Sequence, residues 1–264
     1  SLLVMALSLA GCASYSGLNT RGDSLEAANL QAGRTLEGVT LSPAAWRKVD
    51  GIIVLTGKLS DETLIDMAAL VPVVVTGRQL TAPNLFSIDF DNAEGARLAV
   101  RHLHALGHSR VAFISGPLDH PDAGQRLQGY QSEVAQKEMV TDKDLVVFSD
   151  FQETGGFRAM NNLLESRTQF TAVITANDQM AYGARLALHR AGLRVPEDVS
   201  LIGFDDLPHS AFTLPPLTSV RQSVYEIGTS AANAMFDLLN KKSPPPKLVA
   251  AELVVRESTR IHRR

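Results

Sequence analysis

The chain has 264 residues, of which 45% are hydrophobic and 20% are charged, and its net charge is −3. This composition is typical of a globular protein, and the length allows one large domain or two lobes with a sizeable core. The negative charge, with no block of Lys and Arg, argues against a nucleic-acid-binding domain within these residues, and the single cysteine, Cys12, excludes an internal disulfide.

The first 48 residues are difficult to interpret. Leu2–Ala10 is apolar, and Leu9–Cys12 resembles a lipobox, which would indicate export and lipid attachment at Cys12. The alternative is an apolar helix or strand that ends at Gly11. No Lys or Arg precedes the run, as a signal peptide would require, and the run is too short to span a bilayer. Ala27–Leu36 is compatible with a helix, and no convincing first strand is found.

From Val49 onward, apolar runs of strand length alternate with stretches of helical periodicity. The runs are rich in Val and Ile, which is typical of parallel strands covered on both faces. The predicted strands are Gly51–Leu55, Val73–Thr76, Arg110–Ser115, Leu145–Phe148, Ala172–Thr175 and Ser200–Phe204. This alternation predicts βαβ units and an α/β fold.

Helices are predicted between these strands. Asn92 is placed to cap a helix over Ala93–Leu106, and Gly107 follows as a stop signal. Further helices are expected at Thr154–Leu164, Gln179–Ala191 and Val224–Leu239, and an extended segment at Leu248–Arg256.

Several strings in order resemble the LacI/GalR family of bacterial transcription regulators. They are Leu103–Gly116 (LHALGHSRVAFISG), Asn177–Ala184 (NDQMAYGA), Val195–Asp206 (VPEDVSLIGFDD) and Pro215–Val220 (PPLTSV), and Leu253–Thr259 is similar to the family's closing strand. The resemblance covers roughly Val49 to Arg260. Residues 1–48 match poorly.

The resemblance implies two similar doubly wound parallel-sheet lobes of periplasmic-binding-protein type I, with a ligand cleft between them. The N-terminal lobe is expected at 1–90 plus 222–243 and the C-terminal lobe at 91–219 plus 247–264. The family's DNA-binding helix-turn-helix head is expected to be absent from this chain. A cytoplasmic homodimer without membrane contact is also expected.

The resemblance assigns Arg126 to the effector clamp, for which a guanidinium provides a rigid fork of donors; the alternative is a surface arginine on a helix. Asp205 ends a predicted strand, where open α/β sheets place ligands, and its carboxylate suits sugar or nucleoside hydroxyls; the adjacent Asp206 is expected to be a cap.

Asn177 and Phe151 are further ligand-binding candidates. Asn177 opens a predicted helix, so it could contact the ligand, cap the helix or do both. Phe151 occupies a position where the family often stacks an aromatic ring on the effector; the alternative is a core residue.

Phe90, Asp122 and Val224 fall at further cleft positions of the family. Asp122 departs from the small polar residue common there, and it could pair with Arg126. Gly77 departs from the family's Asp or Asn.

No catalytic or metal site is expected. His102, His104 and His108 are spaced so that they do not converge on one helix face. The chain has no nucleophile elbow, phosphate loop or zinc-protease motif. We therefore expect no enzyme activity and no cofactor. The predicted function is the sensing core of a LacI-type regulator that binds a sugar-like or nucleoside-like effector, including purines, and controls operator binding; the alternative is an exported lipoprotein of the same fold that binds sugar.

Overall fold

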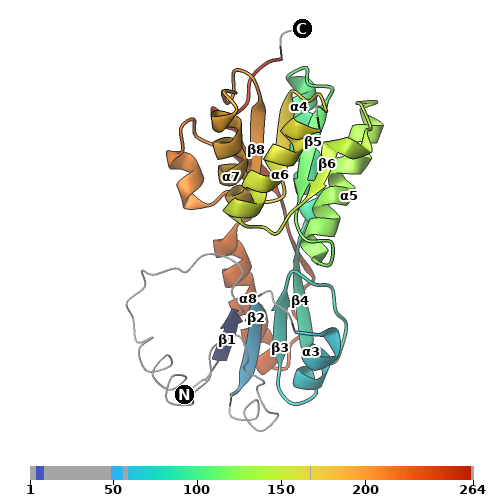
Figure 1. Ribbon diagram of the computed structural model, residues 1–264. Coiled ribbons are helices and arrows are strands. Elements are labelled where there is room, and N and C mark those ends of the chain that lie inside the picture. Colours follow the sequence, from blue (N-terminus) through green and yellow to red (C-terminus); the bar gives the residue numbers. More distant parts are fainter. Residues whose placement is uncertain (1–3, 9–48, 56–58, 167, 263–264) are drawn as a thin grey trace. The chain divides into compact units, whose positions relative to one another are not determined.

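The computed structural model describes residues 4–8, 49–55, 59–166 and 168–262. The chain divides into two compact units (Figure 1). The first unit comprises Ser1–Asp89 and Val224–Leu248, and the second comprises Phe90–Ser223 and Val249–Arg264. The chain therefore passes from one unit to the other three times. Cys12 and the predicted helix at Ala27–Leu36 lie outside the described residues.

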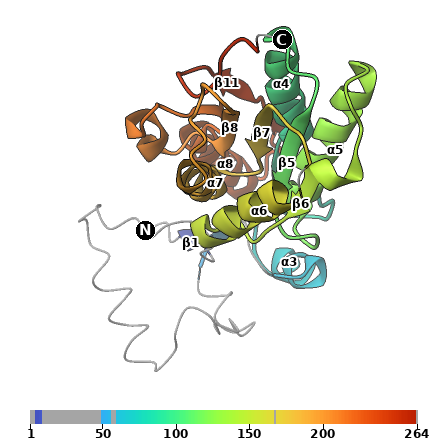
Figure 2. The same cartoon turned by 45° about the horizontal axis from the view of Figure 1, so that its top comes forward.

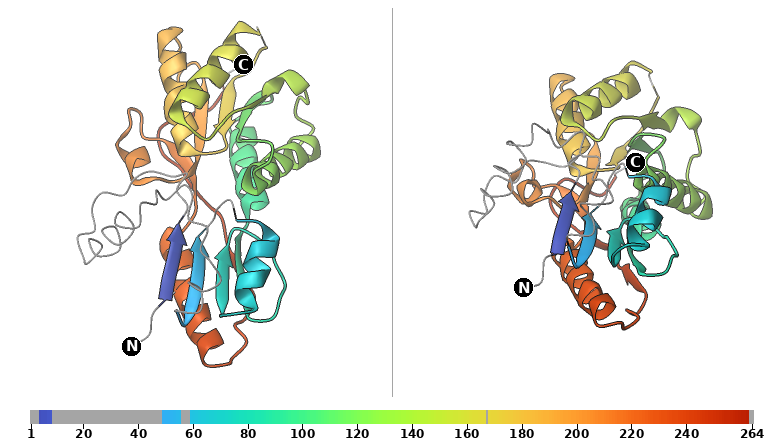
Figure 3. Two further views of the ribbon diagram at one scale, coloured as in Figure 1. Left: turned by 60° about the horizontal axis from the view of Figure 1, so that its bottom comes forward. Right: turned by 90° about the horizontal axis from the view of Figure 1, so that it is seen from below.

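The first unit contains a five-stranded sheet in the order β1-β2-β3-β4-β10 (Figure 3). The four strands β1 to β4 run parallel. Their bounds are Val4–Ser8 for β1, Gly51–Leu55 for β2, Val73–Thr76 for β3, Leu85–Phe90 for β4 and Lys247–Val249 for β10. The sequence analysis found no first strand, but the structure places one at Val4–Ser8, within the apolar run that also suggested an export signal.

Helices α3 (Asp61–Ala68) and α8 (Val224–Leu239) cover opposite faces of this sheet. Ile52 and Val54 of β2 pack in one core cluster with Leu64 and Met67 of α3. The neighbouring Gly51 instead lies against Met235 of α8. Successive strand residues point to opposite faces, so the two helices bury the sheet from both sides.

The second unit contains a six-stranded sheet in the order β11-β9-β8-β7-β5-β6. All pairs are parallel except β11 with β9. The strands are β5 (Val111–Ser115), β6 (Val146–Phe148), β7 (Ala172–Thr175), β8 (Ser200–Asp205), β9 (Thr218–Arg221) and β11 (Glu252–Val254). Every residue of β5 and β7 is buried, as their continuous apolar runs predicted.

Two helix pairs cover this sheet from opposite sides, α4 with α5 and α6 with α7 (Figure 2). Their bounds are Asn92–Ala105, Pro121–Gln136, Glu153–Glu165 and Asp178–Arg190, and short 3-10 turns occupy Lys143–Leu145 and Pro208–Phe212. On β8, Gly203 lies against Asp178 of α7, whereas the next residue, Phe204, lies against Gly95 of α4. The sheet is therefore doubly wound, and polar side chains at its strand ends can converge.

The predicted helix stop at Gly107 is confirmed, but the closing segment is not one extended strand. Gly107 after α4 and Gly192 after α7 have φ of 87° and 75°, which glycine adopts without steric cost. Leu248–Arg256 contributes β10 to one sheet and β11 to the other. No helix in the described part of the chain is long and apolar enough to cross a membrane.

Candidate ligand-binding site

Four of the predicted ligand-binding residues lie just beyond the carboxyl ends of strands in the second unit. Asp205 ends β8, Asn177 follows β7, Phe151 follows β6, and Arg126 lies near the start of α5, which follows β5. Parallel strands end at the same edge of a sheet, and open α/β sheets bind ligands there. The topology therefore brings together residues that are 25 or more positions apart in the sequence.

Arg126 is the centre of this site, with a side chain only 4% exposed. Its Nε donates to Asn92 Oδ1 at 2.7 Å, and its Nη1 donates to the carbonyl of Ala176 and lies 3.3 Å from Asp205 Oδ1. Its guanidinium carbon lies 3.8 Å from the ring centroid of Phe204. The stacking and the two hydrogen bonds hold the guanidinium plane in place.

The Nη2 group of Arg126 makes no hydrogen bond to the described residues. Asp122 Oδ2 lies 4.0 Å from this nitrogen, which is beyond hydrogen-bond distance. Asp122 thus lies beside Arg126, as its position in the sequence suggested. The two N–H donors of Nη2 are available to a ligand oxygen.

Asp205 is a partly accessible acceptor beside this donor, with a side chain 20% exposed. Burial raises the pKa of its carboxyl to about 6; Arg126 acts to lower this pKa, and Asp122 acts to raise it. Asp205 and Phe151 have positive φ values of 98° and 65°. Positive φ is uncommon for residues other than glycine, and such residues cluster at functional sites.

The neighbouring Asp206 does not cap a helix, contrary to expectation. Its carboxylate pairs with Arg221 Nε at 2.8 Å and with Arg256 Nη2 at 2.7 Å. These pairs tie the end of β8 to β9 and to the segment after β11. Two adjacent aspartates therefore have different partners, and only Asp205 faces Arg126.

Asn177 is the N-cap of α7, because its side-chain oxygen accepts from the Met180 N–H at 2.9 Å. Its amide nitrogen donates to the Phe151 carbonyl, also at 2.9 Å. The alternative capping role is thus confirmed, and the same side chain fixes the backbone at Phe151. A ligand contact by Asn177 stays a prediction.

Phe151 is half-buried rather than a core residue. Its ring lies edge-on to that of His120, with centroids 5.1 Å apart, and a Cβ at position 116 would clash with it. Gly116 therefore makes room for the aromatic ring. A half-buried ring at the edge of the sheet suits stacking on a flat or apolar ligand face.

The other two predicted residues lie in different surroundings. Phe90 is buried, and its ring packs edge-on against Phe204 at 6.1 Å between centroids. It thus supports the ring on which Arg126 stacks. Val224 begins α8 in the first unit and is exposed, and its predicted contact stays a prediction.

Sequence reasoning missed Asn92 as a site residue. It was expected to cap α4, but the cap is Asp91, whose side chain accepts from Glu94 N–H at 2.9 Å. Asn92 instead holds Arg126 and donates to Gln125 Oε1 at 2.8 Å and Asp122 Oδ1 at 3.3 Å. Asn92 lies two residues after β4, where polar residues are site candidates, but the sequence analysis did not predict this strand and so could not use that signal.

Asp178 is a second buried carboxylate, fully enclosed behind the site. It accepts hydrogen bonds from Ser210 Oγ at 2.5 Å, Ser219 Oγ at 2.6 Å and Leu207 N–H at 2.7 Å. Burial raises its pKa to about 7, against the effect of these hydrogen bonds. The role of Asp178 is to join α7, β9 and the 207–210 turn.

The histidines form no cluster of ligands. His102 Nε2 lies 3.0 Å from Thr259 Oγ1, and His108 contacts Thr171 Oγ1 at 2.8 Å and the Arg260 carbonyl at 3.1 Å. Within the described ranges, no group of three or more His, Cys, Asp or Glu side chains is placed to hold a metal ion.

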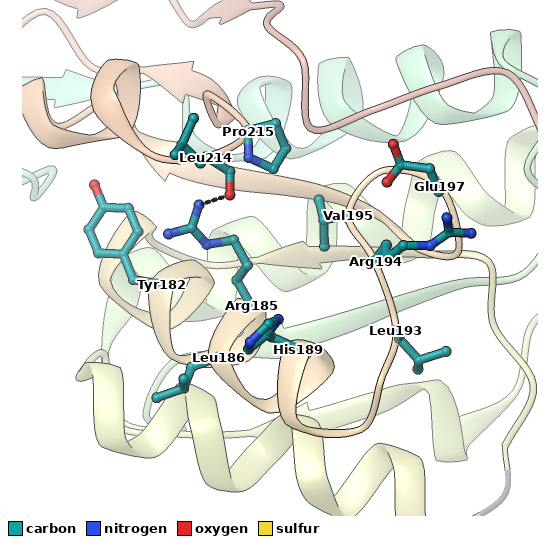
Figure 4. A pocket seen from close by; sticks show the side chains of 10 residues that line it. All are labelled: Tyr182, Arg185, Leu186, His189, Leu193, Arg194, Val195, Glu197, Leu214 and Pro215. Carbon is teal, nitrogen blue, oxygen red and sulfur yellow. Dashed lines mark hydrogen bonds between the residues drawn. The ribbon is translucent and has the colours of Figure 1, made fainter.

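A surface cavity of about 410 Å³ lies elsewhere on the second unit (Figure 4). It is lined by the exposed side of α7, the 193–197 loop and Leu214-Pro215, and Arg185 Nη1 donates to the Leu214 carbonyl across it at 2.6 Å. It contains none of the predicted ligand-binding residues. Its lining mixes charged and apolar side chains, and of the apolar ones Leu186 and Leu214 are exposed.

Comparison with known proteins gives consistent matches. A family model described as a periplasmic binding protein-like domain matches residues 100–259. The transcriptional repressor PurR of Haemophilus influenzae (strain PittEE) is 32% identical over 227 residues, which are 83% of this chain and 67% of PurR. The repressor CytR of Escherichia coli (strain K12) is 34% identical over 217 residues, which are 81% of this chain and 64% of CytR. The chain spans about two thirds of the length of these relatives.

Comparison with solved structures also finds LacI-family regulators. A sugar-binding LacI-family regulator from Escherichia coli, complexed with phosphate, has a TM-score of 0.79 at 28% identity and covers 98% of both chains. A LacI-family regulator from Enterococcus faecium with bound ribose has a TM-score of 0.74 at 26% identity and covers 82% of both. The Lac repressor dimer bound to operator and an anti-inducer has a TM-score of 0.77 at 28% identity, over 98% of this chain and 95% of that one.

These matches confirm the periplasmic-binding-protein-like fold that the sequence predicted. The curated relatives are transcriptional repressors and not enzymes, and they favour a regulator over an exported sugar-binding protein. The chain belongs to the LacI family of transcriptional regulators.

Proposed function

We propose that this chain is the effector-sensing core of a cytoplasmic LacI-type regulator. A small sugar-like, nucleoside-like or purine ligand binds at the strand-end edge of the second unit, and its occupancy controls operator binding. In support, one solved relative was crystallised with ribose. Arg126, Asp205, Asn177, Phe151 and Asp122 form the binding site in this proposal; the contribution of Val224 from the first unit remains a prediction from the sequence.

The observation that carries the proposal is the pairing of Arg126 with Asp205. A buried guanidinium offers two N–H groups that the described chain leaves without a hydrogen bond, and a partly exposed carboxylate lies 3.3 Å from the same guanidinium. A hydroxyl accepts from one group and donates to the other.

A thermal-shift screen of sugars, sugar phosphates, nucleosides and purines tests the proposal. A ligand that binds only the folded state raises the unfolding temperature by linkage. The screen is repeated on Asp205→Asn, which keeps the size of the side chain but removes its charge. The control is Asp144→Asn, at an exposed position in the same unit.

We expect one ligand class to stabilise the native chain and the control alike. For Asp205→Asn, we expect the ligand-dependent shift to be lost, because the ligand hydroxyl loses its charged acceptor; the affinity should fall at least about tenfold, since hydrogen bonds to charged groups contribute about 1.5–3 kcal/mol. A shift that persists unchanged in Asp205→Asn would exclude this site as the effector site.

We further propose that operator DNA is contacted by a helix-turn-helix head outside these 264 residues. The chain spans about two thirds of PurR and CytR, and its net charge of −3 does not suit a phosphate backbone.

We also propose a homodimer, in which a second copy packs against the apolar rim, by which we mean Leu186 and Leu214 at the 410 Å³ cavity on α7 and Phe212, two residues before Leu214. The Lac repressor, with which the chain shares its fold, forms a dimer. Leu214 is 87% exposed, and Phe212 and Leu186 are also exposed beside it. Exposed large apolar side chains near one another mark interaction surfaces, and a two-fold dimer suits palindromic operators.

A further inference from the structure

The charges around Arg126 do not balance. Asp205 Oδ1 lies 3.3 Å from Arg126 Nη1, and Asp122 Oδ2 lies 4.0 Å from Nη2. Two carboxylates thus face one guanidinium. Both carboxylates are partly accessible, with Asp122 18% exposed and Asp205 20% exposed. With both ionised, this group of three side chains carries a net charge of −1.

The direction of the hydrogen bonds disfavours anionic ligand groups, as the net negative charge also does. A ligand oxygen that accepts from Arg126 Nη2 lies within about 7 Å of Asp122 Oδ2, because that oxygen is 4.0 Å from the same nitrogen. A hydroxyl or an N–H group can donate its own proton to the carboxylate. An oxygen of a phosphate dianion or a carboxylate has no proton to donate, so it would face two acceptors of like charge.

Asp122 is not needed to hold the rest of the site. Asn92 Nδ2 donates to Gln125 Oε1 at 2.8 Å and more weakly to Asp122 Oδ1 at 3.3 Å, so Asn92 keeps a partner without Asp122. Arg126 keeps Asn92, Ala176 and Asp205 as partners. The distinctive effect of Asp122 is therefore its negative charge beside the donors that face the ligand.

We propose that Asp122 is a selectivity residue that restricts the site to uncharged, hydroxyl-bearing ligands such as free sugars and nucleosides, and excludes their phosphorylated or carboxylated counterparts. This proposal rests on the proposed function, because it takes the group around Arg126 as the effector site. It narrows the effector class, which the family relationship leaves open.

Inorganic phosphate is the direct probe, and a solved relative was crystallised with phosphate. Its binding is measured by isothermal titration calorimetry on the full chain, on Asp122→Asn and on Asp122→Ser. The Asn variant retains the shape and the contact with Asn92, and the Ser variant provides a second test if the first folds poorly. The matched control is Glu62→Gln, which removes an exposed charge from the first turn of α3 in the first unit.

We expect the native chain and Glu62→Gln to bind phosphate equally weakly. Removal of the carboxylate should tighten phosphate binding at least about tenfold, since two like charges several ångströms apart repel substantially at a partly buried site. Equal phosphate affinity in the native chain and both Asp122 variants would overturn the proposal.

A second arm compares ribose with ribose 5-phosphate and adenosine with adenosine monophosphate. We expect the native chain to prefer the neutral member of whichever pair binds, and Asp122→Asn to reduce that preference. A native preference for the phosphorylated member would also overturn the proposal. If phosphate binding improves in Asp122→Asn while no neutral ligand binds the native chain, the charge selectivity stands and the proposed effector class is wrong.

Discussion

At the residue scale, the carboxylate of Asp205 takes part in two interactions. Its carboxylate pairs with Arg126 in the described chain, and it is the acceptor that we propose for a ligand hydroxyl. A ligand therefore competes with, or adds to, an existing ion pair. Because ionisation of Asp205 controls both interactions, ligand affinity should depend on pH.

The expected direction follows from the pKa of the Asp205 carboxyl, which burial raises to about 6. Above this pH the charged carboxylate accepts a strong hydrogen bond, and below it the protonated group is an uncharged and weaker acceptor. We expect neutral-ligand affinity to be constant above about pH 7 and to fall as the pH decreases through 6. Calorimetric titrations between pH 5 and 8 with the ligand from the thermal-shift screen measure this. An affinity at pH 5 equal to that at pH 8 would contradict it.

At the element scale, helix α5 carries Arg126, and two of its glycines have opposite surroundings. A Cβ at Gly129 would clash with the backbone of Ala93 in α4, whereas a Cβ at Gly124 would meet nothing within 4 Å. We expect Gly129→Ala to destabilise the fold by about 1–3 kcal/mol through overpacking. Gly124→Ala should stabilise it by about 0.5–1 kcal/mol through helix propensity. Urea unfolding followed by circular dichroism checks the pair, and equal shifts in both variants would refute the packing argument.

The elements that the sequence predicted are those with a strong local signal. β5, β7 and β8 are continuous apolar runs, and α4 and α7 are followed by glycines with positive φ. β4 was missed because Ser87 and Asp89 interrupt its apolar run. β10 and β11 are three residues each and belong to different sheets, so only long-range pairing distinguishes them from one extended segment.

The site was predictable to the extent that strand ends and family motifs point to it. Asp205, Asn177 and Phe151 lie at or shortly after strand ends, where parallel topology gathers them. Arg126 lies within α5, and the family resemblance pointed to it. Asn92 was missed because the same residue type before a helix predicts a cap, and only the tertiary structure shows its contact with Arg126. The stacking of Arg126 on Phe204 likewise depends on the pairing of distant segments.

At the scale of the whole molecule, the proposed dimer depends on the apolar rim beside α7. We expect the native chain to sediment as a dimer and Leu214→Glu to raise its dissociation constant at least about tenfold, because a charge cannot be buried unpaired in an apolar interface. Sedimentation velocity over a range of concentrations measures this. The matched control, Val255→Glu, changes another exposed apolar residue and should sediment as the native chain does. Native sedimentation of Leu214→Glu at every concentration would place the interface elsewhere.

The chain crosses between the two units three times, and this affects the order in which the two units fold on the ribosome. The first unit begins with β1 but needs α8, which is translated after nearly all of the second unit. The second unit in turn needs β11, which pairs with β9 and is translated after α8. Domains usually fold one after another as they emerge. Here neither unit can complete its sheet and helix layers early, so apolar strands of both units stay exposed until residues 224–254 have been synthesised.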